Sequence, residues 1–262
     1  MITINSLDIN ALIASYLWCF TRIMGLIAIA PLYGNQGIPA TVKVLLGALL
    51  SAIVAPGLPP IAYADPMSLS GMLILAQQFL IGLAMGFAMR LIFTAVELAG
   101  ELASMTMGLG FASFFDPQSQ GRTAAISSLL SLLTLLVYLA SNLHLALLSA
   151  LVDSFISVPI TSSPIGVSAF RLIAGWGGRI FSAGVQLSLP VVAALLIVNM
   201  ALAVLSRAAP QLNLFGVGFP VTLSVGLLML AFALPYLALP LDRMFADGFG
   251  MIRQLTAALP KT

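Results

Sequence analysis

Long apolar runs, separated by short polar or glycine- and proline-rich segments, dominate the chain. A bilayer span needs about 20 mostly apolar residues, and this pattern predicts six membrane-spanning helices, at residues 12–31, 40–56, 71–89, 123–152, 180–206 and 213–241. The second run is short for a span, and the third continues with helical spacing toward Met107. Pro235 is expected to kink the sixth near its end. Gly82 and Gly86, in "GLAMG", have the small-xxx-small spacing that allows helix backbones to approach closely.

The connections carry clear turn signals. The segment "PLYGNQGIPA" predicts a tight hairpin between the first two runs, and "PGLPPIAYADP" predicts a rigid link after the second. After the fourth run, the polar segment "VPITSSPIGVS" leads into "FRLIAGWGGR". This segment either lies along the membrane surface, which would suit Trp176, or begins the next helix.

Composition supports an all-α integral membrane protein. Of the 262 residues, 61% are hydrophobic and 7% are charged, with a mean hydropathy of +1.13, whereas soluble domains carry about 25% charged residues. Backbone groups in lipid must be satisfied within helices or closed barrels, and a barrel would show short alternating segments. The first apolar run follows Asp8 without a basic leader, so we expect a mature span rather than a signal peptide. The net charge of +2 gives no basis for a nucleic-acid partner.

Four charged residues interrupt the apolar pattern. Arg22 lies midway along the first run, and Arg90, Glu97 and Glu101 share one face of a helix. Charges in membrane segments usually face a bundle interior or a water-filled path. We expect a polar lining or a face toward partner subunits; the alternative is a solvated extension of the helix. Glu97 and Glu101 repel each other, so we expect a basic group nearby, either Arg90 or a residue of a partner.

Residues with catalytic or ligand-binding chemistry are few. His144 is the sole histidine, with Asp153 nine residues on, and a hydrogen-bonded structural histidine is favoured over a proton relay. The single cysteine, Cys19, excludes a disulfide framework or a multi-thiolate metal site. The segment "GLGFAS" resembles part of a dinucleotide fingerprint but follows a helical pattern rather than a strand. The sequence therefore predicts no enzyme, cofactor or metal.

Four segments resemble one known family. They are "FTRIMGLIAIAPLYGNQGIPATVKVLLGALLSAIVAP", "AGELASMTMGLGFASFFDPQSQG", "LHLALL" and "APQLNLFGVGFP". In this order, along nearly the whole chain, they resemble the FliR family of flagellar export-gate components, whose injectisome relatives are the SctT proteins. "GFASFFDPQSQG" is closer to the flagellar branch. Asn142 stands where the family pattern leads us to expect glycine, at what we take to be a helix-packing position.

The resemblance implies a subunit, present once, in a complex with FliP and FliQ in the bacterial inner membrane. It implies a FliP-like part at about residues 1–150, including 105–121, and a FliQ-like part at about 151–262. Together the subunits would form the pore through which unfolded flagellar subunits cross the membrane. FlhB and FlhA would lie on the cytoplasmic side, and the energy would come from other components.

The family resemblance also gives a role to "MTMGLGFASFFDPQSQGR", residues 105–122. Glycines let the backbone leave helical geometry, and Asp-Pro favours an extended or turn conformation. The expected plug or constriction of the closed pore comprises Met105, Met107, Gly108, Gly110, Phe111, Phe114, Phe115, Asp116 and Pro117. The alternative is a buried loop whose aromatic side chains pack against neighbouring subunits.

The segment "APQLNLFGVGFP" is interpreted as a structural hairpin tip between the last two runs. Its expected hairpin residues are Pro210, Asn213, Phe215, Gly218, Phe219 and Pro220. Alternative functions are an injectisome export-gate subunit, a small-solute transporter or a scaffold. A transporter would predict repeated halves and paired acidic residues at mid-span, and the sequence contains neither.

Overall fold

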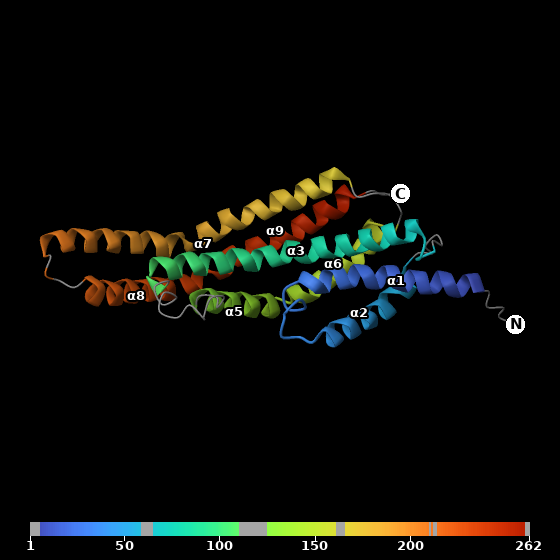
Figure 1. Ribbon diagram of the computed structural model, residues 1–262, viewed down its shortest axis with the longest axis horizontal. Helices are drawn as coiled ribbons and strands as arrows, with labels where there is room; N and C mark the ends of the chain where they lie inside the picture. Colours follow the sequence, from blue (N-terminus) through green and yellow to red (C-terminus); the bar gives the residue numbers. More distant parts are fainter. Residues whose placement is uncertain are drawn as a thin grey trace. The chain divides into compact units, whose positions relative to one another are not determined.

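The computed structural model describes residues 6–58, 65–109, 125–160, 166–209, 211 and 214–259, and for 6–12 and 214–215 only the backbone. Within these ranges the chain is helical and contains no strand (Figure 1). The elements are α1 (Ser6–Ile29), α2 (Ala40–Val54), η1 (Ala55–Gly57), α3 (Leu69–Thr106), α5 (Ala125–Ala140), α6 (Leu143–Ser157), α7 (Val167–Ala208), α8 (Leu214–Ala233), η4 (Leu234–Tyr236) and α9 (Ala238–Ala258). The predicted all-α class is confirmed.

The described residues contain four candidate spans, or five with a bent pair, against the six predicted. Four helical stretches in the described ranges are long and apolar enough to cross a membrane, namely Ala40–Gly57, Leu69–Thr106, Val167–Ala208 and Gly216–Tyr236. The bent pair α5–α6 makes a fifth if it counts as one span. The first predicted span lies in the 24-residue helix α1, whose side chains are described from Ile13 to Ile29 and form an apolar stretch. These apolar helices make the chain a multi-pass membrane protein.

The fourth predicted span is broken. α5 ends at Ala140, α6 begins at Leu143, and the two helices are bent by 65°. Asn142 lies between them in the left-handed conformation, with φ of 54°, which glycine and asparagine adopt more easily than other residues. Its amide N–H bonds to the Leu139 carbonyl at 3.0 Å. Position 142, where the family pattern suggests glycine, therefore lies at the bend. This corrects the interpretation of position 142 as a helix-packing position.

α7 settles how "FRLIAGWGGR" is arranged. One helix of 42 residues runs through this segment and on to Ala208, with Pro190 inside it. The Trp176 indole N–H donates to the carbonyl oxygen of Ala88 in α3 at 3.1 Å. The segment is therefore the start of the long helix, the second of the two alternatives.

The sixth predicted run, 213–241, is interrupted at the expected position, Pro235, and is followed by a helix that the sequence did not predict. α8 ends at Ala233, and Pro235 lies in the 3₁₀ turn η4 (Leu234–Tyr236). α9 then begins at Ala238 and continues to Ala258. Proline lacks an N–H and disfavours continuation of a regular helix, which confirms the expected break.

The chain forms two compact units, each assembled from separate stretches. Unit 1 comprises Met1–Leu91, Tyr138–Gly177 and Ala246–Thr262, and unit 2 comprises Ile92–Val137 and Gly178–Phe245. The helices α3, α7 and α9 each contribute to both units. The expected FliP-like and FliQ-like parts concern relationships to other chains and stay a prediction.

In unit 1, α1 and α3 pack at very short range through glycine. A methyl group on Gly82 would lie 2.9 Å from both the Arg22 carbonyl carbon and the Leu26 nitrogen, and one on Gly86 would lie 2.8 Å from the Leu26 carbonyl oxygen. Both distances are too short for a side chain. The close approach predicted from "GLAMG" is confirmed, and α1 is the partner helix.

In unit 2, helices of three other chain segments pack around the second half of α3. A methyl group on Gly100 would lie 2.8 Å from the Ser127 nitrogen of α5, and one on Gly184 of α7 would lie 2.9 Å from the Ala95 carbonyl oxygen. Met107, directly after α3, packs against Gly226 of α8. These contacts hold the end of α3 and the start of α5 within unit 2, on either side of the segment predicted to be functional.

Candidate functional site

The structure describes only the first part of the predicted plug. Met105 is 61% exposed, and Gly108 has a φ of 85°, a left-handed conformation that glycine adopts without strain. The Met107 side chain is fully buried. Since it is buried inside its own chain, it cannot line a lumen in this conformation, which corrects its expected role. Other predicted plug residues lie outside the described ranges, namely Gly110, Phe111, Phe114, Phe115, Asp116 and Pro117.

Two contacts fix Met107 to α8. A methyl group on Gly226 would lie 2.5 Å from Met107 Cγ, 2.7 Å from Cε and 3.0 Å from Sδ, so the methionine occupies the space left by the missing side chain. The Thr222 hydroxyl lies 3.2 Å from the Met107 carbonyl oxygen and 3.1 Å from the Phe219 carbonyl oxygen. A hydroxyl has one proton to donate, so these two carbonyls share it.

The far end of the same segment is fixed to α3. Ser127, in the first turns of α5, is 1% exposed. Its hydroxyl donates to the Glu97 carbonyl oxygen at 2.7 Å, and the Ser131 hydroxyl lies 3.3 Å from Glu97 Oε1. Gly100 allows the α5 backbone to approach α3 closely at Ser127. The residues on both sides of 110–124 are therefore held by packing within unit 2.

The predicted polar face of α3 is accessible in part. Arg90 is exposed, while Glu97 and Glu101 are half-buried. Glu97 makes the bonds to α5 just described. Glu101 forms no hydrogen bond or ion pair in the part of the chain that the structure describes. That this face contacts other subunits stays a prediction.

Arg22 forms a buried polar cluster inside unit 1. The side chain is fully buried; Nε donates to Gln78 Oε1 of α3 at 2.8 Å. One terminal nitrogen donates to the Ser154 carbonyl at 2.8 Å and lies 3.2 Å from the Ser154 hydroxyl, and the other donates to the Val158 carbonyl at 2.9 Å. The guanidinium carbon lies 4.3 Å from the Phe155 ring centroid. The cluster thus joins α1 and α3 to the end of α6.

The chemistry of this cluster is structural. Within the described residues, Arg22 bonds to uncharged oxygens, and two of these are carbonyls at the C-terminal end of α6, where the helix dipole favours a cation. A buried charge needs such hydrogen bonds to offset its desolvation. Gln78 Nε2, also buried, has no hydrogen-bond partner in the described ranges. The expectation that Arg22 faces a lumen or a partner subunit is therefore wrong, because its partners lie within its own chain.

The predicted hairpin tip is shorter than expected. α7 ends at Ala208 and α8 begins at Leu214, so Phe215, Gly218, Phe219 and Pro220 belong to a helix. Pro210 and Asn213 lie outside the described residues. Pro220 lies inside α8, beyond its first turn, so its missing N–H removes one hydrogen bond of that helix. Pro220 is therefore not part of the turn between α7 and α8.

Among the described residues, neither the titratable groups nor the cavities form a recognisable reactive centre. The His144 ring lies 6.3 Å from the Tyr138 ring in a tilted arrangement, and its Nδ1 has no hydrogen-bond partner among the described residues, unlike the hydrogen-bonded histidine expected. No group of three His, Cys, Asp or Glu side chains suited to a metal occurs in the described ranges.

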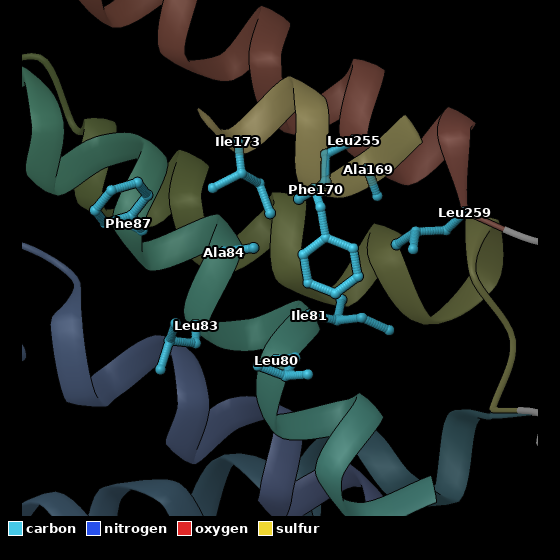
Figure 2. Close-up of a pocket in the computed structure, with 10 residues that line it drawn as sticks. All are labelled: Leu80, Ile81, Leu83, Ala84, Phe87, Ala169, Phe170, Ile173, Leu255 and Leu259. Carbon is cyan, nitrogen blue, oxygen red and sulfur yellow. The ribbon is translucent and has the colours of Figure 1, made fainter. Parts of the chain in front are cut away.

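A pocket with a volume of about 260 Å³ lies in unit 1, between α3, α7 and the C-terminal end of α9; Figure 2 shows the residues that line it. Its lining is apolar: Leu80, Ile81, Leu83, Ala84, Phe87, Ala169, Phe170, Ile173, Leu255 and Leu259. With no polar side chain among these, the cavity has no group that could orient a polar substrate.

The residues that hold this architecture were mostly not identified from the sequence. Thr222, Gly226 and Ser127 look like ordinary small residues of membrane helices, and Gln78 and Ser154 lie 56 and 132 positions from Arg22. The sequence offers only a general indication of these partners. An arginine within an apolar run requires several hydrogen-bond acceptors, so polar residues in the other apolar runs are candidate partners of Arg22.

Comparison with known proteins places these features in one family. The chain matches the bacterial export proteins, family 1, over residues 13–248. It is 39% identical to the flagellar biosynthetic protein FliR of Pectobacterium carotovorum subsp. carotovorum over 99% of both chains. Identity to the FliR protein of Escherichia coli (strain K12) is 38% over 94% of each chain. Identity to the FliR protein of Bacillus subtilis (strain 168) is 30%, over 94% of this chain and 96% of the relative.

Proposed function

Since the chain belongs to the FliR family of flagellar export proteins, we propose that it assembles with FliP and FliQ into the export gate. Unfolded flagellar subunits would cross the bacterial inner membrane through this pore. The observation that carries the proposal is similarity to flagellar FliR proteins over nearly the full length. The same similarity favours the flagellar apparatus over an injectisome.

The exposed surface of the chain supports assembly with other subunits in lipid. In the hydrophobic window of α7 only 17% of residues are buried within the chain, and in that of α8 22%. Large apolar side chains are exposed there, including Ile197, Met200 and Val204 at 69–70% and Phe232 at 64%. A surface of this kind is stable only against lipid tails or other apolar helices. We therefore expect FliP and FliQ to cover part of it and lipid to cover the rest.

Within this gate, we propose that residues 105–121 obstruct the resting pore. Glycine at 108, 110 and 121 and the three phenylalanines combine backbone freedom with bulky apolar groups. In support, the two helices that flank the segment are tied to their neighbours at Met107 and Ser127. Flanks that are held in place restrict the region that 15 intervening residues, 110–124, can occupy.

Co-purification tests the assembly. The tagged chain is expressed with FliP and FliQ, extracted in mild detergent and separated on a native gel. We expect one defined complex that contains all three proteins. A stable, monodisperse monomer that leaves FliP and FliQ behind would overturn the proposed assembly.

A substitution pair tests the obstruction. Phe114→Asp places a charge among apolar groups and should hydrate the constriction, whereas Phe114→Leu keeps it apolar. We expect Phe114→Asp to raise ion conductance of the reconstituted complex well above that of Phe114→Leu, at equal complex yield. Equal conductance of the two assembled complexes would contradict a constriction at this residue.

A further inference from the structure

The apolar pocket of unit 1 has a buried floor and an exposed rim. Five side chains that are at most 7% exposed form the floor, namely Ile81, Ala84, Ala169, Leu255 and Leu259. Two other lining residues, Leu80 and Phe170, are 42% and 51% exposed, and in Figure 2 the Phe170 ring points from α7 toward α3. The pocket therefore leads from the outside of the chain into the core of unit 1.

Hydrocarbon is the ligand class that this lining accepts. All the lining side chains are aliphatic or aromatic, so none of them can hydrogen-bond to a polar ligand group. An apolar cavity of about 150 Å³ takes up benzene, and the volume of about 260 Å³ in unit 1 has room for a longer stretch of hydrocarbon. Since the chain is a multi-pass membrane protein, the tails of the surrounding lipid supply such hydrocarbon.

The charge beside the pocket indicates which lipid fits. Arg171 follows Phe170 in α7, is exposed, and its side chain forms no hydrogen bond or ion pair in the part of the chain that the structure describes. α7 begins at Val167, so Ala169 and Phe170 lie in its first turn, where backbone N–H groups have no helical acceptor and favour an anion. The stretches of α3, α7 and α9 within unit 1 carry three arginines and one acidic residue. This charge balance complements the phosphate of an anionic lipid.

We propose that the pocket is a binding site for one anionic phospholipid of the membrane, with an acyl chain between α3, α7 and α9 and the phosphate at Arg171. The acyl chain packs against three helices that come from separate stretches of the chain, so the bound lipid stabilises unit 1 as a ligand stabilises any folded state that it binds. The proposal goes beyond the export gate and does not depend on it, because it concerns unit 1 alone.

Native mass spectrometry tests the site. The full-length chain is expressed with FliP and FliQ, extracted in mild detergent, and incubated with phosphatidylglycerol or with phosphatidylcholine, whose headgroup has no net charge. We expect phosphatidylglycerol to bind about fivefold more tightly, the ratio that corresponds to about 1 kcal/mol for one basic residue near an anionic lipid. Equal binding of the two lipids would overturn the proposal. If FliP and FliQ do not co-purify, the same comparison is made on the chain as it is extracted, so failure of the gate proposal leaves this test intact.

Ala84→Leu tests the place of the acyl chain, with Ala174→Leu as the matched control. Leucine at position 84 occupies part of the pocket floor, so we expect lipid binding to weaken about tenfold or more from the lost burial of tail methylenes. Ala174 is exposed on α7 and outside the lining, and the same change there should leave lipid binding unaltered. Unaltered binding in Ala84→Leu would overturn the proposal.

The thermal midpoint in lipid-free detergent separates filling of the pocket from damage to the fold. Ala84→Leu should keep or raise the midpoint, because added carbon atoms that pack in a cavity stabilise a protein, whereas a damaged fold would lower it. If Ala84→Leu lowers the midpoint, Ala169→Leu on α7 fills the same pocket from its other wall. Normal lipid binding in this second variant would overturn the proposal.

Arg171→Gln tests the phosphate contact, and Arg207→Gln, an exposed position at the other end of α7, is its control. Arg171→Gln should abolish most of the preference for phosphatidylglycerol, whereas Arg171→Lys, which keeps the charge, should retain it. The preference of the wild type should also fall as salt is added. A preference that is unchanged in Arg171→Gln would overturn the assignment of the phosphate to this residue.

A photocrosslinker at position 170 identifies what covers the rim. Benzoylphenylalanine in place of Phe170 should label phospholipid when the membrane-inserted complex is illuminated. Labelling of another subunit, or of a second copy of this chain, in place of phospholipid would overturn the proposal, because a protein segment would then occupy the pocket.

Discussion

Gly82→Ala is the sharpest test of how unit 1 is built. The added methyl group would lie 2.9 Å from the Arg22 carbonyl carbon and from the Leu26 nitrogen of α1. Non-bonded heavy atoms are most stable about 3.5–4.0 Å apart. Both obstacles are backbone atoms, so no side chain can rotate away, and α1 and α3 must separate by about 1 Å.

The separation also acts on the Arg22 cluster. The bond from Arg22 Nε to Gln78 Oε1 is 2.8 Å long, and an added separation of about 1 Å takes it beyond hydrogen-bonding distance. Overpacking costs about 1–3 kcal/mol, and a hydrogen bond to a charged group contributes about 1.5–3 kcal/mol. Alanine regains about 1 kcal/mol of helix propensity. The net loss in free energy of unfolding is therefore about 1.5–5 kcal/mol.

The control is Gly250→Ala in α9, where an added methyl group meets nothing within 4 Å. The assay compares membrane-inserted chain at fixed expression and the thermal midpoint of the detergent-extracted complex. Gly82→Ala should lower both, whereas Gly250→Ala should leave both unchanged or raise them slightly. Equal midpoints for the two variants would show that α1 and α3 are not packed at the distance described.

Two further substitutions test local features of unit 1 in the same assay. Arg22→Lys keeps the charge but replaces the planar guanidinium with a single nitrogen, which cannot reach Gln78, Ser154 and Val158 together. We therefore expect the free energy of unfolding to fall by about 3 kcal/mol or more. The control is Arg253→Lys at an exposed position, and equal stability of the two variants would refute the cluster. At the α5–α6 bend, Asn142→Val should destabilise by about 1–2 kcal/mol because β-branched residues resist the left-handed conformation, while Asn142→Gly should not; equal effects would argue against that conformation.

The sequence predicted those features that depend on neighbouring positions. Apolar runs of membrane length identified most of the long helices, the proline at 235 identified the end of α8, and "GLAMG" identified the face of α3 that approaches another helix. Each signal is local, because it depends on spacing within one helix or on one residue's backbone geometry.

The errors arose where contacts join distant positions. Arg22 was expected to need a partner outside the chain, since the acceptors at Ser154 and Val158 lie 132 and 136 residues away. Thr222 meets Met107 across 115 residues, and no periodic pattern marks such a pair. The break at Asn142 was missed because the surrounding run is uncharged and long enough for one span, so hydropathy outweighed a single turn-forming residue.

The most direct test of the account is the ion conductance of the assembled gate without residues 110–118. The deletion removes Phe111, Phe114 and Phe115 and touches none of the helices in the described ranges. The complex should form in normal amount on a native gel, and its conductance in a lipid bilayer should rise far above the wild-type value. A deletion complex that assembles normally and is as tight as the wild type would contradict the account, and residues 105–121 would then not close the pore.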